Sequence, residues 1–289
     1  PSAVFASMIA AKLRPPTPNA TANATQRAAI ANIDKIEICE ADKIITAVEN
    51  QNSLTTQERS IASLLATKMA TGISHLLIDI PVGSRAKIKT SQEAMHLRKL
   101  IEYVSDMIGL NVDITITDGS EPIGNGIGAA LEARDVMKVL KNKEDAPDDL
   151  KEKALFMAGR ILEFDPKLRG GQGYLVAKEM LKSGKAFDSF EQILKKQGKK
   201  EPTQLGHLTR DIVADKAGKI ARINTSLIGR IAVLAGAGQY AGAGIDLFHK
   251  VGDNVAVGDI LYRIYSCNQN DFAFVSSVIE SGKTGFDIE

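Results

Sequence analysis

The stretch that decides the fold reads LLIDIPVG (76–83), VDITIT (112–117), DGSEPIGNGIG (118–128) and AALEARDVMKVL (129–140). The first two segments are short apolar runs rich in β-branched residues, which is typical of buried strands. Between them, the apolar spacing of residues 91–108 predicts an amphipathic helix. Strand, helix and strand at this spacing predict a right-handed βαβ unit with parallel strands.

A glycine-rich loop, residues 118–128, follows the second strand and opens the next helix. Glycine lets the backbone approach a ligand closely, and a helix N-terminus offers unpaired N–H groups and a positive dipole end. The pattern therefore predicts a site for an anion or a polar small molecule. The alternative is a purely structural turn, because glycine-rich loops also close ordinary βα connections.

Composition narrows the class of protein. The chain has 289 residues, of which 44% are apolar and 25% charged, and its formal net charge is +1. This balance gives no sign of a nucleic acid or membrane partner, and no apolar run is long enough to span a bilayer. Residues 1–13 are interpreted as a core helix rather than a signal peptide. Cys39 and Cys267 lie far apart without metal-ligand spacing, which favours reduced thiols and a cytoplasmic location.

We predict an α/β fold in two domains. A mostly parallel, helix-covered sheet is expected in residues 1–198, and a smaller α+β, barrel-like domain in residues 203–289, with the basic segment 198–206 as the linker. Helices are expected at 58–71, 150–163, 173–183, 187–197 and 226–234, and strands at 73–80, 210–214, 218–223, 245–249 and 260–265.

The segment VGDNVAVGDIL (251–261) suggests an alternative, namely that the C-terminal part is a binding module. Its sequence also resembles the hammerhead of biotinyl and lipoyl carrier domains. A carrier needs a lysine at an exposed hairpin tip, and Lys216 and Lys219 are the candidates. However, the helix-forming segment SLIGRIAVLAGAG (226–238) occupies the place where a compact carrier would continue. This makes the carrier the weaker interpretation.

Three separated stretches together resemble the thymidine phosphorylase and AMP phosphorylase family of nucleoside phosphorylases. They are LLIDIPVGSRAKIKT (76–90), TDGSEPIGNGIGAALEARDVMKVL (117–140), and AGKIARIN (217–224) through GAGIDLFHKVGDNVAVGDILYRIYS (242–266). The resemblance implies a pentosyltransferase that catalyses reversible phosphorolysis of a nucleoside or nucleoside 5′-monophosphate. Inorganic phosphate would be the co-substrate, and no cofactor would be required. The family's small C-terminal barrel would explain why residues 251–261 resemble a carrier domain in sequence.

The resemblance also implies a base-binding helix. The family's helix resembles ITASILSKK, and the matching text here is SIASLLATK (60–68). By this match Ser63 contacts the base, Lys68 corresponds to the second lysine, and Thr67 stands where the base-binding lysine is expected. A threonine keeps a hydroxyl donor but loses the charge and the reach. The alternative is an ordinary helix serine and a solvated lysine.

Asp79 and Gly83 fall at the end of the first strand, where α/β sheets place their ligands. We expect both to line the substrate cleft, with Gly83 as a possible hinge. The alternative is a capping aspartate followed by a tight turn.

A cation site is implied at the glycine-rich loop. Asp135, together with the carbonyl groups of Ile123 and Gly126, matches a family position that helps to bind a monovalent cation. The alternative is a solvent-facing helix aspartate paired with Lys138.

No catalytic residue can be assigned. The KxSxGG-like loop that holds phosphate in the family, and the histidine belonging to it, do not occur in the 289 residues, and no arginine lies near Val48. Two expectations remain open: a phosphorylase of which this is an incomplete part, or a degenerate relative that binds a ligand or partner without turnover. Either way, we expect little phosphorolysis from these residues alone.

The family is dimeric through helices near its N-terminus. Phe5, Met8 and Ile9 form an apolar stripe that a single copy would leave exposed. We therefore predict a homodimer in which two domains close over the substrate.

Overall fold

The structure is a computed structural model that describes residues 57–70, 72–84, 86–280 and 284–289. Strands β1 (His75–Val82) and β2 (Asn111–Asp118) run parallel and in continuous register, from His75 opposite Asn111 to Val82 opposite Asp118. Helix α3 (Ser91–Met107) connects them. The predicted βαβ unit is confirmed, and with it the α/β class. Thr90 caps α3, because its hydroxyl accepts a hydrogen bond from the Glu93 N–H at 3.1 Å.

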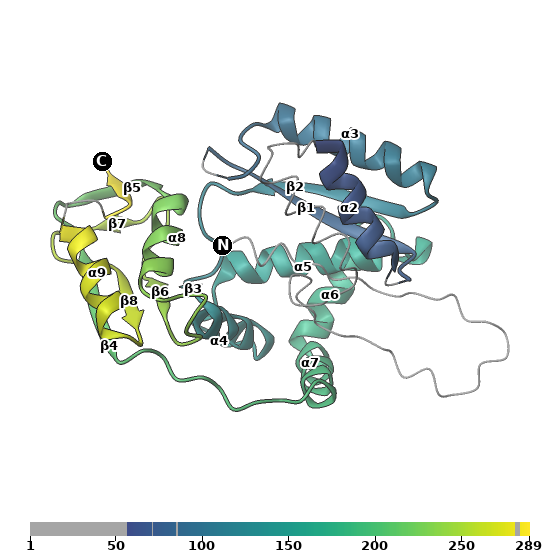
Figure 1. Ribbon diagram of the computed structural model, residues 1–289. Helices are drawn as coiled ribbons and strands as arrows, with labels where there is room; N and C mark the ends of the chain where they lie inside the picture. Colours follow the sequence, from purple (N-terminus) through teal and green to yellow (C-terminus); the bar gives the residue numbers. More distant parts are fainter. Residues whose placement is uncertain (1–56, 71, 85, 281–283) are drawn as a thin grey trace.

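Side-chain alternation gives the β1–β2 sheet one apolar and one polar face. Helices α2 (Gln57–Ala70) and α3 pack on the apolar face, and α5 (Asp148–Leu162) contacts the other (Figure 1). The apolar side forms one core, whose buried members are Ile61, Leu65, Leu76, Ile80, Ala94, Ile101, Leu110 and Ile114. The opposite side presents Asp79 and Thr117 to Lys153 of α5, and Asp113 to Arg160. This polar face is where a site can form.

The middle of the chain is helical. It contains α4 (Ala129–Leu140), α5, the short 3₁₀ helix η3 (Pro166–Leu168), α6 (Gln172–Lys182) and α7 (Lys185–Lys196). The four α-helices lie within two residues of the expected bounds, whereas η3 was not predicted. Helices α5 and α6 approach each other at two glycines, since a Cβ on Gly173 would lie 2.2 Å from the carbonyl oxygen of Gly159.

The C-terminal part forms two antiparallel sheets, with strand orders β3-β6-β8-β4 and β7-β5-β9. Its elements are β4 (Leu208–Val213), β5 (Gly218–Ile223), α8 (Thr225–Leu234), β6 (Gly244–Leu247), β7 (Asn254–Val255), β8 (Ile260–Ser266), α9 (Gln269–Glu280) and β9 (Phe286–Ile288). The sequence predicted β4, β5, α8, β6 and β8, but it did not predict the short strands β7 and β9 or helix α9.

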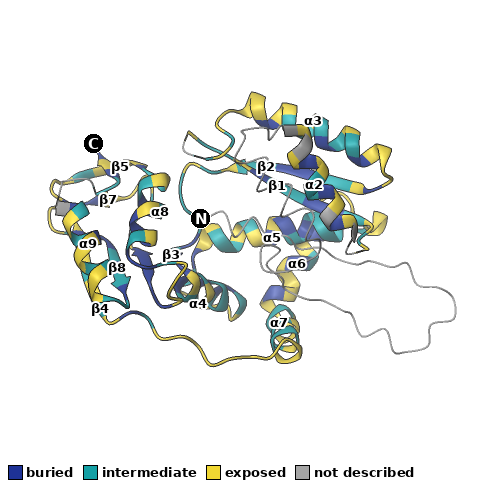
Figure 2. Ribbon diagram, in the orientation of Figure 1, coloured by how far each residue is buried: buried dark blue, intermediate teal, exposed yellow. Residues whose placement is uncertain are grey.

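The glycine-rich loop itself supplies strand β3 (Gly126–Ile127), which was also not predicted. In this strand Gly126 pairs with Asp246 and Ile127 with Ile245. Figure 2 shows β3 and β6 among the buried elements, and Ile127 belongs to the core of the C-terminal part. Residues 126–127 are therefore built into the sheet that residues 208–266 complete. The predicted division at residues 198–203 stays a prediction.

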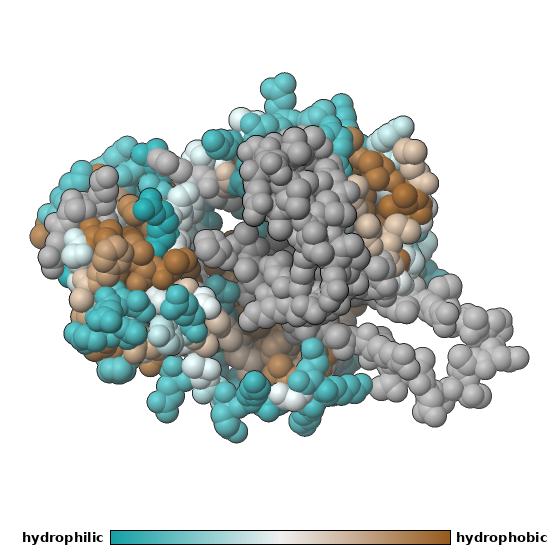
Figure 3. Space-filling view, in the orientation of Figure 1, coloured by the Kyte–Doolittle hydropathy of each residue, from teal (hydrophilic) through white to brown (hydrophobic). Residues whose placement is uncertain are grey.

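The C-terminal part also carries apolar side chains on its surface. Figure 3 shows them over α8 and α9, the helices to which the exposed Val233 and Phe274 belong. None of the described helices combines the length and the apolar character that a membrane-spanning helix needs.

Tyr262 makes the stability of the C-terminal core depend on pH in the alkaline range. Its side chain is fully buried, its hydroxyl donates to the Thr284 carbonyl at 3.0 Å, and its ring stacks on Phe286. Burial raises the pKa of Tyr262 above its ordinary value. In the unfolded chain the Tyr262 hydroxyl ionises at pH ~10, whereas in the folded chain it stays protonated at that pH. The stabilisation that Tyr262 contributes is therefore complete below pH ~10 and is lost as the pH rises towards the folded-state pKa.

We expect Tyr262→Phe to remove this alkaline loss of stability. Above pH ~10, the free energy of unfolding of the unmodified chain should fall faster than that of the variant, by up to about 1.4 kcal/mol per pH unit. Urea unfolding between neutral pH and pH ~11 measures both slopes. Parallel pH profiles would contradict the role of Tyr262.

Candidate functional site

Polar groups gather on the α5-facing side of β1 and β2, towards the ends of the two strands. The carboxylate of Asp79 lies 2.6 Å from the Lys153 ammonium and accepts a hydrogen bond from the Thr117 hydroxyl at 2.8 Å. Lys153 also donates to the Thr117 hydroxyl at 3.1 Å. The Asp79 side chain is 3% exposed and that of Lys153 19%. Asp79 is thus a buried carboxylate held by a cation and a hydroxyl from two other elements.

This arrangement differs from a capping aspartate, because the partners of Asp79 are side chains on β2 and α5. A buried carboxylate needs both a counter-charge and hydrogen bonds, and Lys153 and Thr117 supply them. The triad of Asp79, Thr117 and Lys153 fixes α5 against the strand ends, where an α/β sheet presents its ligand-binding loops. A direct contact of Asp79 with a substrate stays a prediction.

Gly83 lies where the loops after β1 and β2 come together. A Cβ on Gly83 would lie 2.6 Å from the Gly119 carbonyl oxygen, and Gly119 donates its N–H to the Val82 carbonyl at 2.8 Å. The Gly83 N–H donates to the Ile88 carbonyl at 3.1 Å. Glycine is required here by the close approach of two backbones rather than by a left-handed conformation.

We expect Gly83→Ala to lower the free energy of unfolding by about 1–3 kcal/mol, because the new methyl group meets backbone atoms that cannot rotate away. The matched control is Ser84→Ala at the exposed neighbouring position, where a change within about 0.5 kcal/mol is expected. Urea unfolding compares the two variants, and equal losses would show that the loops separate without cost.

The predicted base-contacting residues lie on α2. Lys68 is buried, with 4% of its surface exposed, and Ser63 is half-buried; both have interaction partners. The alternative of a solvated lysine is therefore wrong. Thr67 belongs to α2, but its side chain lies outside the described residues.

Lys68 and Gly83 lie towards opposite ends of β1. Lys68 is in the last turn of α2, shortly before β1 begins, and Gly83 follows its end. A strand of this length spans about 26 Å. Lys68 therefore lies in the segment that leads into the beginning of β1, whereas Gly83 follows its end, and the assignment of base contacts on α2 stays a prediction.

Asp135 anchors the glycine-rich loop. It is 1% exposed, and its Oδ2 accepts the N–H groups of Asn125 and Gly126 at 2.8 and 2.7 Å. Its Oδ1 accepts the Nε and Nη2 hydrogens of Arg134 at 3.1 and 3.0 Å. The alternative of a solvent-facing aspartate paired with Lys138 is wrong, because Asp135 is buried and Lys138 pairs with Asp145 at 2.7 Å.

Arg134 joins this loop anchor to the C-terminal sheet. Both of its terminal nitrogens donate to the Asp246 carboxylate at 2.6 Å. The hydrogen bonds to Asp246, followed by the charges of Asp246 and Asp135, raise the pKa of Arg134 despite its partial burial. A bidentate pair of this kind fixes orientation as well as distance. The middle of α4 is therefore tied to β6.

Lys250 binds the loop from its other side. Its ammonium donates to the carbonyl oxygens of Pro122 and Gly124 at 2.6 and 2.7 Å, and to the Asp149 carboxylate at 2.9 Å. Asp149 accepts the Gly124 N–H at 3.0 Å with the same oxygen. Sequence reasoning missed Arg134, Asp149, Lys153 and Lys250, because no local pattern marks them and each is defined by a partner far along the chain.

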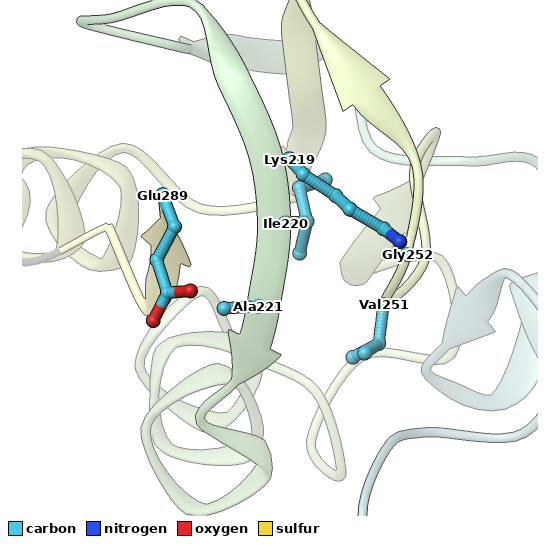
Figure 4. A pocket seen from close by; sticks show the side chains of 6 residues that line it. All are labelled: Lys219, Ile220, Ala221, Val251, Gly252 and Glu289. Carbon is cyan, nitrogen blue, oxygen red and sulfur yellow. The ribbon is translucent and has the colours of Figure 1, made fainter.

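Neither a metal-ligand cluster nor the pocket beside β5 provides a second candidate site among the described residues. The described residues contain no group of three or more His, Cys, Asp or Glu side chains that could hold a metal ion. A pocket of about 310 Å³ lies beside β5, but Figure 4 shows its two charged side chains, Lys219 and Glu289, reaching to opposite sides of the strand. Lys219 belongs to β5 itself rather than to a hairpin tip, unlike the attachment lysine of a carrier domain.

Comparison with known proteins identifies the scaffold. Residues 219–283 match the pyrimidine nucleoside phosphorylase C-terminal domain. A protein of Albidiferax ferrireducens named "Putative thymidine phosphorylase" is 44% identical over 254 residues, covering 86% of this chain and 49% of the relative. Relatives of the same name from a Bradyrhizobium strain and Methylococcus capsulatus are 47% and 44% identical, covering 86% of this chain and 49% and 48% of their own lengths.

The chain spans about half the length of the curated relatives that it matches. The matched part includes the stretch that builds the βαβ unit and the glycine-rich loop, since it extends over 86% of the 289 residues. The C-terminal domain match covers β5 to α9, including Lys250. The chain belongs to the thymidine phosphorylase family.

Proposed function

We propose that the protein containing this chain is a pentosyltransferase that catalyses reversible phosphorolysis. A nucleoside or nucleoside 5′-monophosphate and inorganic phosphate would give the free base and the corresponding ribose 1-phosphate. The observation that carries this proposal is the 44–47% identity to the named relatives over 86% of the chain. The alternative of a non-catalytic binding scaffold has less support, because the relatives that the chain matches are named as phosphorylases.

The geometry suits a reaction that asks mainly for positioning. Phosphorolysis needs the phosphate, the sugar and the base held in line, and positioning of this kind can contribute about 7–11 kcal/mol. Three sets of contacts hold the strand ends and the loop after β2: Asp79 with Lys153, Asp135 with two loop N–H groups, and Lys250 with two loop carbonyls. Loops fixed in this way can hold a substrate without reorganising during the reaction.

We assign proposed roles on this basis. Asp79 and Gly83 border the substrate at the strand ends, and Ser63, Thr67 and Lys68 belong to a base-binding helix. Substrate closure would bring the two proposed domains together over the substrate, as lids and hinged domains do in other enzymes. The proposed domains remain residues 1–198 and 203–289, with the hinge near the segment between them.

The test is base release. The protein is incubated with inorganic phosphate and a panel comprising thymidine, uridine and nucleoside 5′-monophosphates including AMP, and the free base is quantified by chromatography. Release that requires phosphate supports the proposal. The full-length Bradyrhizobium relative serves as the comparison, and the 289-residue chain alone tests the expectation of little activity from these residues. If the relative releases base and the protein containing this chain releases none, the phosphorylase proposal fails.

The substrate preference is a finer proposal. The names of the relatives favour thymidine as the substrate, whereas the sequence of residues 76–83 and 121–128 looks closer to the AMP phosphorylase branch. Comparing kcat/KM for thymidine and AMP in the same panel discriminates the two. A 5′-phosphate preference would appear as a large difference between adenosine and AMP.

We also propose a cytoplasmic homodimer that acts without an organic cofactor. The apolar stripe of Phe5, Met8 and Ile9, on which the dimer was predicted, lies outside the described residues. Light scattering at micromolar concentration tests this proposal, and a monomer at that concentration would contradict it.

A further inference from the structure

We propose that Lys250 provides from within the chain the positive charge that holds the glycine-rich loop, so that this loop takes no monovalent cation. The family resemblance implies such a cation at Asp135 with the carbonyls of Ile123 and Gly126. The donor set at that position does not suit it, and a lysine ammonium is already bound to the carbonyls of Pro122 and Gly124, one and two residues earlier in the loop. The proposal concerns loop stability and ion dependence, so it stands or falls separately from phosphorolysis.

Asp135 has no oxygen left for a cation. A carboxylate offers about four acceptor positions, two on each oxygen. On Asp135 all four are used: two by the N–H groups of Asn125 and Gly126, and two by Arg134. At 1% exposure the residue cannot turn towards solvent to recruit an ion. A cation here would have to displace buried hydrogen bonds and would face the Arg134 guanidinium.

Lys250 has the coordination that a bound cation would otherwise have. An ammonium group has three N–H donors, and the three oxygens at 2.6, 2.7 and 2.9 Å use all of them. Two of these oxygens are main-chain carbonyls of the loop, and the third is a carboxylate. Main-chain carbonyls and a carboxylate are the oxygen ligands that hard cations take in proteins. The Lys250 side chain is 23% exposed, so its charge is largely withdrawn from water.

The position of Lys250 makes this charge a link between separate parts of the fold. Lys250 follows β6, whereas the oxygens that accept its hydrogen bonds belong to the loop after β2 and to the first turn of α5. The neighbouring Val251 N–H donates to the Glu121 carboxylate at 3.0 Å. A free ion could hold two carbonyls together, but a lysine also fixes which sheet they are held against. Lys250 is therefore a positioning residue for the loop.

The test needs the unmodified chain first. Thermal unfolding is measured in potassium chloride and, at equal ionic strength, in the chloride of a large organic cation that cannot enter a site of this size. We expect the same midpoint in both, because the ammonium already occupies the carbonyl oxygens. A midpoint that rises saturably with potassium would overturn the proposal without any variant being made.

Lys250→Met gives the second arm, with Lys199→Met as the matched control, since Lys199 forms an exposed pair with Glu191. In Lys250→Met we expect the unfolding midpoint to fall by about 3–6 °C, and the Gly124 amide to exchange with solvent about tenfold faster. The control should change neither. Potassium should recover part of the loss only in Lys250→Met, because only that variant frees the carbonyls of Pro122 and Gly124. Unchanged exchange at Gly124 would overturn the role of Lys250.

Discussion

Replacing Lys153 with methionine is expected to lower the free energy of unfolding by about 3–5 kcal/mol. The variant leaves the Asp79 carboxylate 3% exposed and without its counter-charge at 2.6 Å. Only the hydroxyls of Thr115 and Thr117 then remain within hydrogen-bonding distance of it. An uncompensated buried charge is far more costly than an exposed one, since the low-dielectric interior replaces neither the water nor the partner.

The control for this variant is Lys138→Met. Lys138 also binds an aspartate at 2.7 Å, but Asp145 is 69% exposed. An exposed pair contributes about 0–1 kcal/mol. Guanidinium unfolding of both variants separates the two cases, and comparable losses would mean that burial does not set the cost at Asp79.

A second variant distinguishes loss of the pair from loss of packing. Adding Asp79→Asn to Lys153→Met removes the unpaired charge and keeps a side chain of similar size. The double variant should be more stable than Lys153→Met alone, which gives a coupling energy of opposite sign to the single losses. If the losses of the two single variants simply add, the two residues do not act as a pair.

The regular elements could be predicted because their apolar residues repeat at the helix or strand period. The helices from α3 to α8 and the strands β1, β2, β4, β5, β6 and β8 follow this rule. Strands β3, β7 and β9 have two or three residues each, which is too short for a period to be recognised. Helix α9 begins QNDF and contains two serines and two valines, a composition with little helix preference, and it forms because Val275 and Ile279 pack into the C-terminal core.

The candidate site could be predicted only in part, for a different reason. Asp79 and Asp135 were recognised because they lie beside a strand end and a glycine-rich loop. What these residues do is decided by their partners and surroundings: Lys153 lies on α5, and Arg134 connects to Asp246 112 positions away. Lys250 meets Asp149 across 101 positions. A local pattern contains no information about such pairs. The sequence around Asp135 would therefore be the same whether its side chain faced solvent or was buried.

Asp135→Asn is the second large effect that we expect, with a loss of about 3–5 kcal/mol in the free energy of unfolding. An amide has one oxygen and one NH₂ group, whereas the site presents N–H donors on both sides. If the oxygen faces Asn125 and Gly126, the NH₂ group faces the Arg134 donors; if it is turned round, two loop N–H groups lose their acceptor. Either orientation leaves buried donors unsatisfied and removes one of the two carboxylates that bind Arg134.

The matched control is Asp145→Asn, at a position 69% exposed, where a change of less than about 1 kcal/mol is expected. Amide exchange adds a local readout that global unfolding lacks. In Asp135→Asn the amides of Asn125 and Gly126 should exchange faster, while those of β1, which this carboxylate does not touch, should change only as far as overall stability falls. Uniformly faster exchange would mean that Asp135 stabilises the fold as a whole without holding the loop, and the loop would then have to be positioned by Lys250 and Asp149 alone.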